Sequence, residues 1–211
     1  MGNRWLFRKL KIPETFKKCS RTQNKLTMVS KKIILSFLLI SFCTSIQAQK
    51  YFTKTGITNF KASVAAFEPV AATSNSTTVI VNTVDGRFAA LLFMKSFHFK
   101  VALMEEHFNE NYMDSDKFPK GTFKGSIVGF NFSDLSEMEK EYTIKGMLNI
   151  RGIDKEVESI AKIKRVNSTI SLTTNFSVTP QDFDIKIPNI VRKKISERIN
   201  ITLEYELIEK K

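Results

Sequence analysis

Between residues 56 and 207, apolar and polar side chains alternate with a period of two along most of the chain. The clearest runs are YTIKGMLNIR at residues 142–151, ISLTTNFSV at 170–178 and INITLEYEL at 199–207. Because successive side chains of a β-strand point to opposite faces, this period predicts strands with one buried face. Weaker runs predict further strands at residues 56–67, 77–84, 87–94, 121–132 and 157–166.

Turn signals separate several of these strands. Asp85-Gly86 predicts a two-residue hairpin turn, and Arg151-Gly152 is a second turn candidate. No internal repeat, low-complexity tract or linker interrupts residues 49–211, so we expect them to form one domain. About eight antiparallel strands joined by short turns predict an all-β fold, either a sandwich or a closed barrel.

Two segments depart from the alternation. VALMEEHFNENYM at residues 101–113 has its apolar side chains at helical spacing, which predicts a short helix packed on the sheet. NIVRKKISER at residues 189–198 follows a proline and is either a second helical turn or a polar loop. The expected fold is therefore all-β with one or two short helices.

One predicted strand is apolar on both of its faces. It is FAALLFM at residues 88–94, and further phenylalanines follow at residues 97, 99, 123, 130 and 132. A strand of this kind has apolar surroundings on both sides. Either it belongs to a thick core beneath a covering helix, or it lines an apolar cavity inside a barrel. The sequence leaves both interpretations open.

A secretory signal peptide is predicted at residues 28–48. Two lysines precede a largely apolar run at residues 33–42, and Ala48 supplies the small residue before the cleavage site. The apolar run is too short to span a bilayer as a helix. We expect export to the periplasm, or secretion as the alternative, and a working domain at residues 49–211. Residues 1–27 are interpreted as an upstream extension without structure.

Cleavage changes the charge and the available chemistry. The whole chain has a net charge of +12, but residues 1–48 hold ten basic residues and one acidic residue. The remainder holds 23 basic and 20 acidic residues, which does not favour nucleic-acid binding. Both cysteines and the one tryptophan also fall within the removed part. A lipid anchor on Cys43 is disfavoured, because bulky Phe42 precedes it.

Four segments of the mature chain resemble the YceI-like family in the same order. They are HFNENYMDS at residues 107–115, KFPKGTFKG at 117–125, GMLNIRGIDK at 146–155 and FSVTPQDFDIKI at 176–187. In the third segment, asparagine and aspartate replace the threonines that the family usually carries. The family is described as lipid- or polyisoprenoid-binding proteins of the bacterial periplasm.

The resemblance implies a lipocalin-like antiparallel β-barrel of about eight strands, with an apolar tunnel that holds an isoprenoid tail. We therefore expect a non-enzymatic binding protein for an isoprenoid or other long-chain lipid. The candidate cavity-lining residues are Phe88, Ala90, Leu92, Met94, Phe108, Tyr112, Phe123, Ile127, Leu148, Ile150, Leu172, Phe176, Ile201 and Leu203. Phe108 and Tyr112, four residues apart on the predicted helix, either close the opening or seal the core.

Catalytic and metal-binding motifs are missing from the mature sequence. His98 and His107 lack the spacing of a zinc pair, and no nucleophile elbow, zinc-protease motif or phosphate-binding glycine loop is present. We expect no catalytic residues, no metal and no cofactor. Two rivals remain: a filled-core structural or partner-binding envelope domain, and a small envelope enzyme with both histidines and acids gathered in one pocket.

Short basic clusters occur at residues 162–165 and 192–194. They are interpreted as solvated surface, as a weak contact for anionic lipid headgroups, or as a site for the phosphate of an isoprenoid phosphate. We expect a lipid ligand, no nucleic-acid partner and no transmembrane span. A homodimer, the identity of the ligand and the pathway served are left open.

Overall fold

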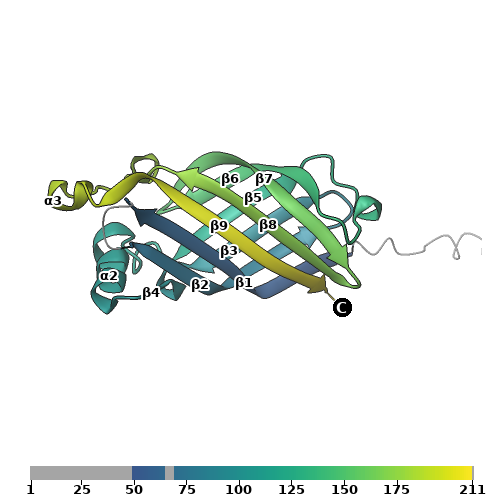
Figure 1. Cartoon of the computed structure of the whole chain (residues 1–211), viewed down its shortest axis with the longest axis horizontal. Coiled ribbons are helices and arrows are strands. Elements are labelled where there is room, and N and C mark those ends of the chain that lie inside the picture. Colours follow the sequence, from purple (N-terminus) through teal and green to yellow (C-terminus); the bar gives the residue numbers. More distant parts are fainter. Residues whose placement is uncertain (1–48, 65–68, 211) are drawn as a thin grey trace, which may run out of the picture. The chain divides into compact units, whose positions relative to one another are not determined.

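The computed structural model describes residues 49–64 and 69–210 of the chain. The predicted extension and signal peptide lie outside the described residues. Nine strands account for most of the described part (Figure 1). They are β1 (Lys50–Ser63), β2 (Ala71–Asn82), β3 (Arg87–Phe93), β4 (His98–Phe99), β5 (Lys120–Ile127), β6 (Lys140–Ile150), β7 (Ile153–Val166), β8 (Thr169–Val178) and β9 (Ile195–Glu209).

Eight of these strands close into an antiparallel β-barrel. Their order around the barrel is β1-β9-β8-β7-β6-β5-β3-β2, and pairing between β1 and β2 completes the circle. The two-residue strand β4 pairs with β2 as an additional strand. Closure pairs the edges that an open sheet would expose. The prediction of an all-β, lipocalin-like barrel of about eight strands is confirmed.

The barrel forms where the sequence alternates because every second side chain enters its interior. On β8, Ile170, Leu172 and Thr174 are buried, whereas Thr173 and Asn175 are exposed. The same period runs through β6 and β9. Burial of one apolar face against the interior is what stabilises such strands.

The two turn predictions have different outcomes. Ile150 pairs with Ile153, so Arg151 and Gly152 form the expected two-residue turn, with φ of +52° and +78°. The predicted two-residue turn at Asp85-Gly86 is wrong, because β2 ends at Asn82 and four residues join it to β3.

Packing explains the wider turn at residues 83–86. The Gly86 N–H donates to the Asn82 carbonyl over 2.9 Å. Gly86 has φ of +68°, and a Cβ added there would lie 2.8 Å from the Cβ of Phe130. The glycine therefore gives the turn its backbone conformation and lets the Phe130 segment pack against it.

Helical segments are short and lie mostly at one end of the barrel. The predicted helix at residues 101–113 is α2 (Ala102–His107), continued by a π-helical turn η2 (Phe108–Tyr112). The predicted segment 189–198 divides into α3 (Asn189–Arg192) and the start of β9. The 3₁₀ turns are η1 (Met94–Ser96), η3 (Phe132–Asp134) and η4 (Pro180–Phe183). Within the described ranges, no helix has the length and apolar character that a membrane crossing would require.

The two ends of the barrel are filled differently. One end, which we call the packed end, contains a cluster of buried side chains that includes Val79, Ile163 and Leu207. Leu135, from the loop between β5 and β6, is 4 % exposed and belongs to the same cluster. At the other end, which we call the open end, α2 and α3 flank the barrel (Figure 1).

Candidate ligand cavity

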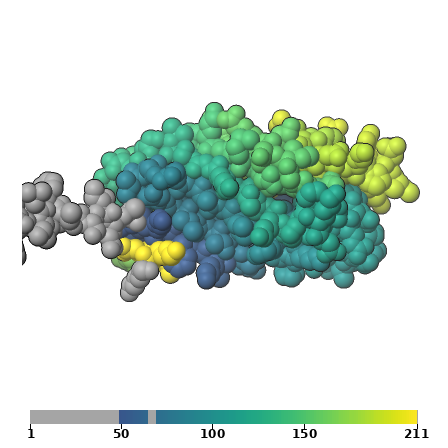
Figure 2. Space-filling view, turned by 180° about the vertical axis from the view of Figure 1, so that it is seen from behind, coloured from purple at the N-terminus to yellow at the C-terminus, as the bar shows by residue number. Residues whose placement is uncertain are grey.

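A cavity of about 600 Å³ extends into the barrel from the open end. All eight barrel strands contribute side chains to its wall, together with α2, η2 and the segment around α3. The wall is overwhelmingly apolar. This size lies within the usual range for small-molecule sites, which are mostly apolar with a few polar groups. Figure 2 shows the α3 region in yellow and the α2 region in teal at the same end of the molecule.

Most of the residues predicted from the sequence lie together on this wall. Twelve do so: Phe88, Ala90, Leu92, Met94, Phe108, Tyr112, Phe123, Leu148, Ile150, Phe176, Ile201 and Leu203. Ile127 and Leu172 belong instead to the packed end, where they are 3 % and 1 % exposed. Strand alternation identifies which face of the sheet a residue occupies but not its depth along the barrel axis. It therefore cannot separate these two residues of the packed end from those at the level of the cavity.

An aromatic cluster surrounds the outer part of the cavity. The ring of Phe60 lies 5.1 Å from Phe97, 5.6 Å from Phe99 and 5.3 Å from Phe108, measured between centroids. Phe60 was not among the predicted lining residues, although its strand lies within the alternating region. Phe108 is thus part of the cavity wall and of the aromatic packing beneath α2.

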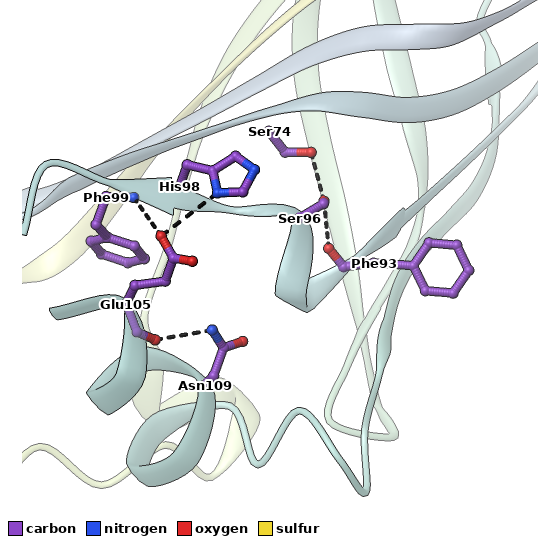
Figure 3. Close-up of polar contacts among 7 residues, drawn as sticks. All are labelled: Ser74, Phe93, Ser96, His98, Phe99, Glu105 and Asn109. Atoms are coloured by element: carbon purple, nitrogen blue, oxygen red, sulfur yellow. Dashed lines mark hydrogen bonds and ion pairs between the residues drawn. The ribbon is translucent and has the colours of Figure 1, made fainter. Parts of the chain in front are cut away.

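A polar network fixes α2 to strand β4 (Figure 3). The backbone N–H of Phe99 donates to Glu105 Oε2 over 3.0 Å, and His98 Nδ1 lies 3.7 Å from the same oxygen. Asn109 Nδ2 donates to the Glu105 carbonyl over 2.9 Å. These contacts position the apolar side of the helix over the aromatic cluster. They therefore hold one wall of the opening in place.

A second network lies beside the first and fixes the turn that precedes β4. Ser96 Oγ donates to the Phe93 carbonyl over 2.6 Å and lies 2.7 Å from Ser74 Oγ on β2 (Figure 3). Ser74 is fully buried. Buried hydroxyls need such partners, and here the partners tie η1 to the barrel.

Hydroxyl groups interrupt the apolar wall at its inner end. Thr58, Thr77 and Tyr205 line the cavity where it meets the packed end, and Tyr205 belongs to the packed cluster itself. Burial raises the pKa of Tyr205 to about 12, because the ionised phenol would lose its hydration. Burial likewise raises the pKa of Tyr112 near the opening. Thr58, Thr77 and Tyr205 are not among the lining residues predicted from the sequence.

The structure does not gather the histidines into one reactive site. His107 lines the cavity, whereas His98 lies on β4, is 73 % exposed and pairs with Glu105. Among residues 49–64 and 69–210, no group of three or more His, Cys, Asp or Glu side chains is placed to hold a metal ion. The two histidines therefore lie in different surroundings, one on the cavity wall and one on the exposed strand β4.

The two basic clusters lie in different surroundings. Lys164 pairs with Glu139 over 3.3 Å, and the Arg165 guanidinium lies 4.7 Å from the ring of Phe132. Both contacts belong to the packed end. The second cluster, Arg192, Lys193 and Lys194, is exposed beside the opening and forms no ion pair with a described residue. Its last member, Lys194, also lines the cavity.

Comparisons with solved structures identify the same architecture elsewhere. A polyisoprenoid binding domain from Saccharophagus degradans, implicated in plant cell wall breakdown, superposes with a TM-score of 0.67 at 10 % identity, over 76 % of this chain and 98 % of that one. BcnA from Burkholderia cenocepacia gives 0.59 at 14 % identity, over 72 % and 95 %. A YceI protein from Campylobacter jejuni gives 0.51 at 18 % identity, over 64 % and 81 %. The TM-scores establish a shared fold, and at identities this low the likeness extends to the fold alone.

A search of the curated proteins found no match. The family model described as the YceI-like domain, in contrast, matches residues 43–207. This match covers well over half of the chain and includes β1 to β8 and all but the last two residues of β9. The chain therefore belongs to the YceI-like family.

Proposed function

We propose that this protein is a non-enzymatic binding protein that holds an isoprenoid or other long-chain lipid in its cavity. The observation that carries the proposal is a cavity of about 600 Å³ with an apolar wall. All eight barrel strands build this wall, and the cavity opens beside α2 and α3. One protein of the same fold is described as a polyisoprenoid binding domain, which supports this class of ligand.

Burial of the hydrocarbon chain supplies the binding free energy. Each CH₂ group moved from water into an apolar site contributes about 0.8 kcal/mol. Association and ordering of the chain offset several kcal/mol of that gain. A hydrocarbon chain of about ten to twenty carbons therefore gains enough free energy to bind stably, whereas a much shorter chain does not. The gain depends on contact with a continuous apolar wall, which Phe88, Leu148 and Ile201 help to provide.

The surface around the opening supports contact with an anionic membrane. Ile190 on α3 is 88 % exposed and Leu103 on α2 is 57 % exposed. Arg192, Lys193 and Lys194 follow Ile190 after one intervening residue, Val191. Apolar side chains enter the lipid interface while basic ones attract anionic headgroups, each by about 1 kcal/mol. In this proposal the open end meets the membrane and receives its lipid there.

Export to the periplasm completes the proposal. The predicted signal peptide at residues 28–48 supports it. We expect the chain that performs the function to begin at Gln49. Sequencing the N-terminus of the protein recovered from the periplasm tests this boundary.

Native mass spectrometry tests lipid binding. The mature protein, isolated from its own periplasm, is expected to carry an added mass that organic extraction identifies as a long-chain lipid. If no lipid is recovered, and none binds when an isoprenoid is added to the delipidated protein, the proposal is wrong. A filled-core structural domain would then be the better account.

A further inference from the structure

Three hydroxyls form a connected cluster at the inner end of the cavity. Thr58 Oγ1 lies 2.8 Å from Thr77 Oγ1 and 3.3 Å from the Tyr205 hydroxyl. The three residues are only 3 %, 1 % and 2 % exposed, and all of them line the cavity. We call them the hydroxyl cluster.

A glycine makes room for this arrangement. A Cβ added to Gly56 would lie 2.6 Å from Tyr205 Cδ1 and 2.9 Å from Cε1. Real Cβ atoms do not approach a ring so closely, so any side chain here would displace the ring of Tyr205. The absence of a side chain at this position lets the tyrosine bring its hydroxyl to Thr58.

The hydroxyl cluster has one more donor than it can use. Each hydroxyl carries one O–H, so the cluster has three donors. Its two internal contacts use two of them, whichever way the protons point. Among the described residues, no other side chain or carbonyl accepts a hydrogen bond from Thr58, Thr77 or Tyr205. One buried O–H is therefore left to bond with something in the cavity, since an unpaired buried donor is unfavourable.

A second pair of hydroxyls on the same cavity wall provides a contrast. Thr174 Oγ1 donates to the Ile160 carbonyl over 2.8 Å, and Ser159 Oγ, 3.1 Å away, is a second acceptor for the same O–H. The single O–H of Thr174 therefore has its acceptor within the protein. Thr174 thus leaves no O–H for a ligand, in contrast to the hydroxyl cluster.

The surroundings select a neutral acceptor. Phe88 stacks on Tyr205 with 6.4 Å between ring centroids, and Ile144 lies on the same apolar inner wall. Burial strong enough to raise the pKa of Tyr205 to about 12 disfavours a charge at this depth. A phosphate or carboxylate would lose its hydration here without a cation to compensate it. A carbonyl or ether oxygen can accept the hydrogen bond without that cost.

We infer that the ligand carries a neutral oxygen at its inner end and that this oxygen accepts a hydrogen bond from the hydroxyl cluster. The inference rests on the proposed function, because it concerns the same cavity. It also sets a direction of entry. A lipid whose oxygen-bearing end lies at the membrane surface enters the open end with that end first, and its hydrocarbon tail follows toward α2 and α3.

Two matched probes test the inference on the delipidated mature protein. One is farnesylacetone, an isoprenoid ketone, and the other is the same chain with a methylene in place of the carbonyl. The wild type is expected to bind the ketone about fivefold to tenfold more tightly, the value of one ordinary hydrogen bond. The variant Thr58→Val/Thr77→Val/Tyr205→Phe, which keeps the shapes and removes all three donors, is expected to bind both probes within about twofold.

The control is Thr174→Val, which removes a cavity hydroxyl that already donates to a carbonyl. It is expected to keep the preference for the ketone. Equal binding of the two probes by the wild type would mean that solvent serves the surplus donor, and would overturn the inference while leaving the proposed function intact. Failure of both probes to bind would overturn the proposed function and the inference together.

An infrared measurement on the wild type gives an answer even if the triple variant does not fold. The carbonyl stretch of bound farnesylacetone is expected at a lower wavenumber than in hexane, because a hydrogen bond weakens the C=O bond. A stretch at the hexane position would overturn the inference.

Discussion

The packed end and the open end are built by the same eight strands, yet one is solid and the other hollow. At the packed end the inward side chains are large and mostly branched, such as Val79, Ile163 and Leu207, each at most 1 % exposed. At the level of the cavity several inward residues are small, among them Ala90, Gly121 and Ser159. Barrel closure alone therefore does not decide whether the interior is filled.

The coverings of the two ends differ as well. The loop at residues 128–139 covers the packed end and inserts Leu135, while Phe132 lies 5.5 Å from Tyr51. At the open end, α2 is tied by Glu105 to the backbone of Phe99 beside the cavity. One covering fills the interior and the other frames an opening. In this account the packed end contributes most to the stability of the barrel, and the open end binds the lipid.

Truncating one leucine at each end should give the largest contrast. Leu172→Ala removes a fully packed side chain and is expected to lower the free energy of unfolding by about 2–5 kcal/mol. Leu148→Ala, whose side chain already borders the cavity, should cost roughly 1 kcal/mol, because less packing is lost. Urea denaturation of the delipidated protein measures both values. Equal losses would contradict the division into two ends.

Alkaline pH should weaken the junction between the two ends. Burial raises the pKa of Tyr205 in the folded protein to about 12, from the ordinary tyrosine value of 10.0. Between pH 10 and 12 the unfolded chain therefore releases this proton while the folded chain keeps it, so stability falls as the pH rises. We expect wild-type stability to drop by about 2–3 kcal/mol more than that of Tyr205→Phe over this interval. Parallel pH profiles of the two proteins would contradict the burial of the phenol.

Filling the cavity should abolish binding without unfolding the barrel. Ala90→Trp places an indole in the open space and is expected to weaken the binding of a long-chain isoprenoid at least about tenfold, which is about 1.4 kcal/mol. The unfolding midpoint should change little, because the new ring occupies empty volume. Isothermal titration calorimetry measures the first value and thermal unfolding the second. Retained affinity would mean that the ligand binds elsewhere.

Loosening α2 should have the smallest effect. Glu105→Ala removes the acceptor of the Phe99 N–H and is expected to cost about 0.5–1.5 kcal/mol of stability. It should speed lipid release severalfold, because the helix beside the opening becomes more mobile. Stopped-flow exchange of a fluorescent lipid measures the rate. Glu106→Ala, an exposed neighbour on α2 without a hydrogen bond to β4, is the matched control.

The barrel was predictable from the sequence because alternation reports strand faces directly. The runs at residues 142–151, 170–178 and 199–207 became β6, β8 and β9. The family resemblance supplied barrel closure, which alternation alone had left open against a sandwich. The predicted turn at Asp85-Gly86 is wrong because a tertiary contact with Phe130 sets the loop.

The cavity was harder to predict because no local sequence pattern reports how far along the barrel axis a side chain lies. Ile127 and Leu172 share the inward face with residues that line the cavity, but they lie at the packed end. Thr58 and Thr77 were missed because threonine on a strand is ordinary. Their significance depends on the short distance to Tyr205, which lies 147 positions after Thr58 in the chain.

Tryptophan fluorescence tests most directly whether lipid occupies the open end alone. Residues 49–211 contain no tryptophan, so Phe176→Trp on the cavity wall and Phe132→Trp at the packed end each give a single reporter. Titration with a brominated long-chain lipid is expected to quench Trp at position 176 strongly and Trp at position 132 hardly at all. Equal quenching at both positions, or none at either, would contradict a lipid held in the cavity.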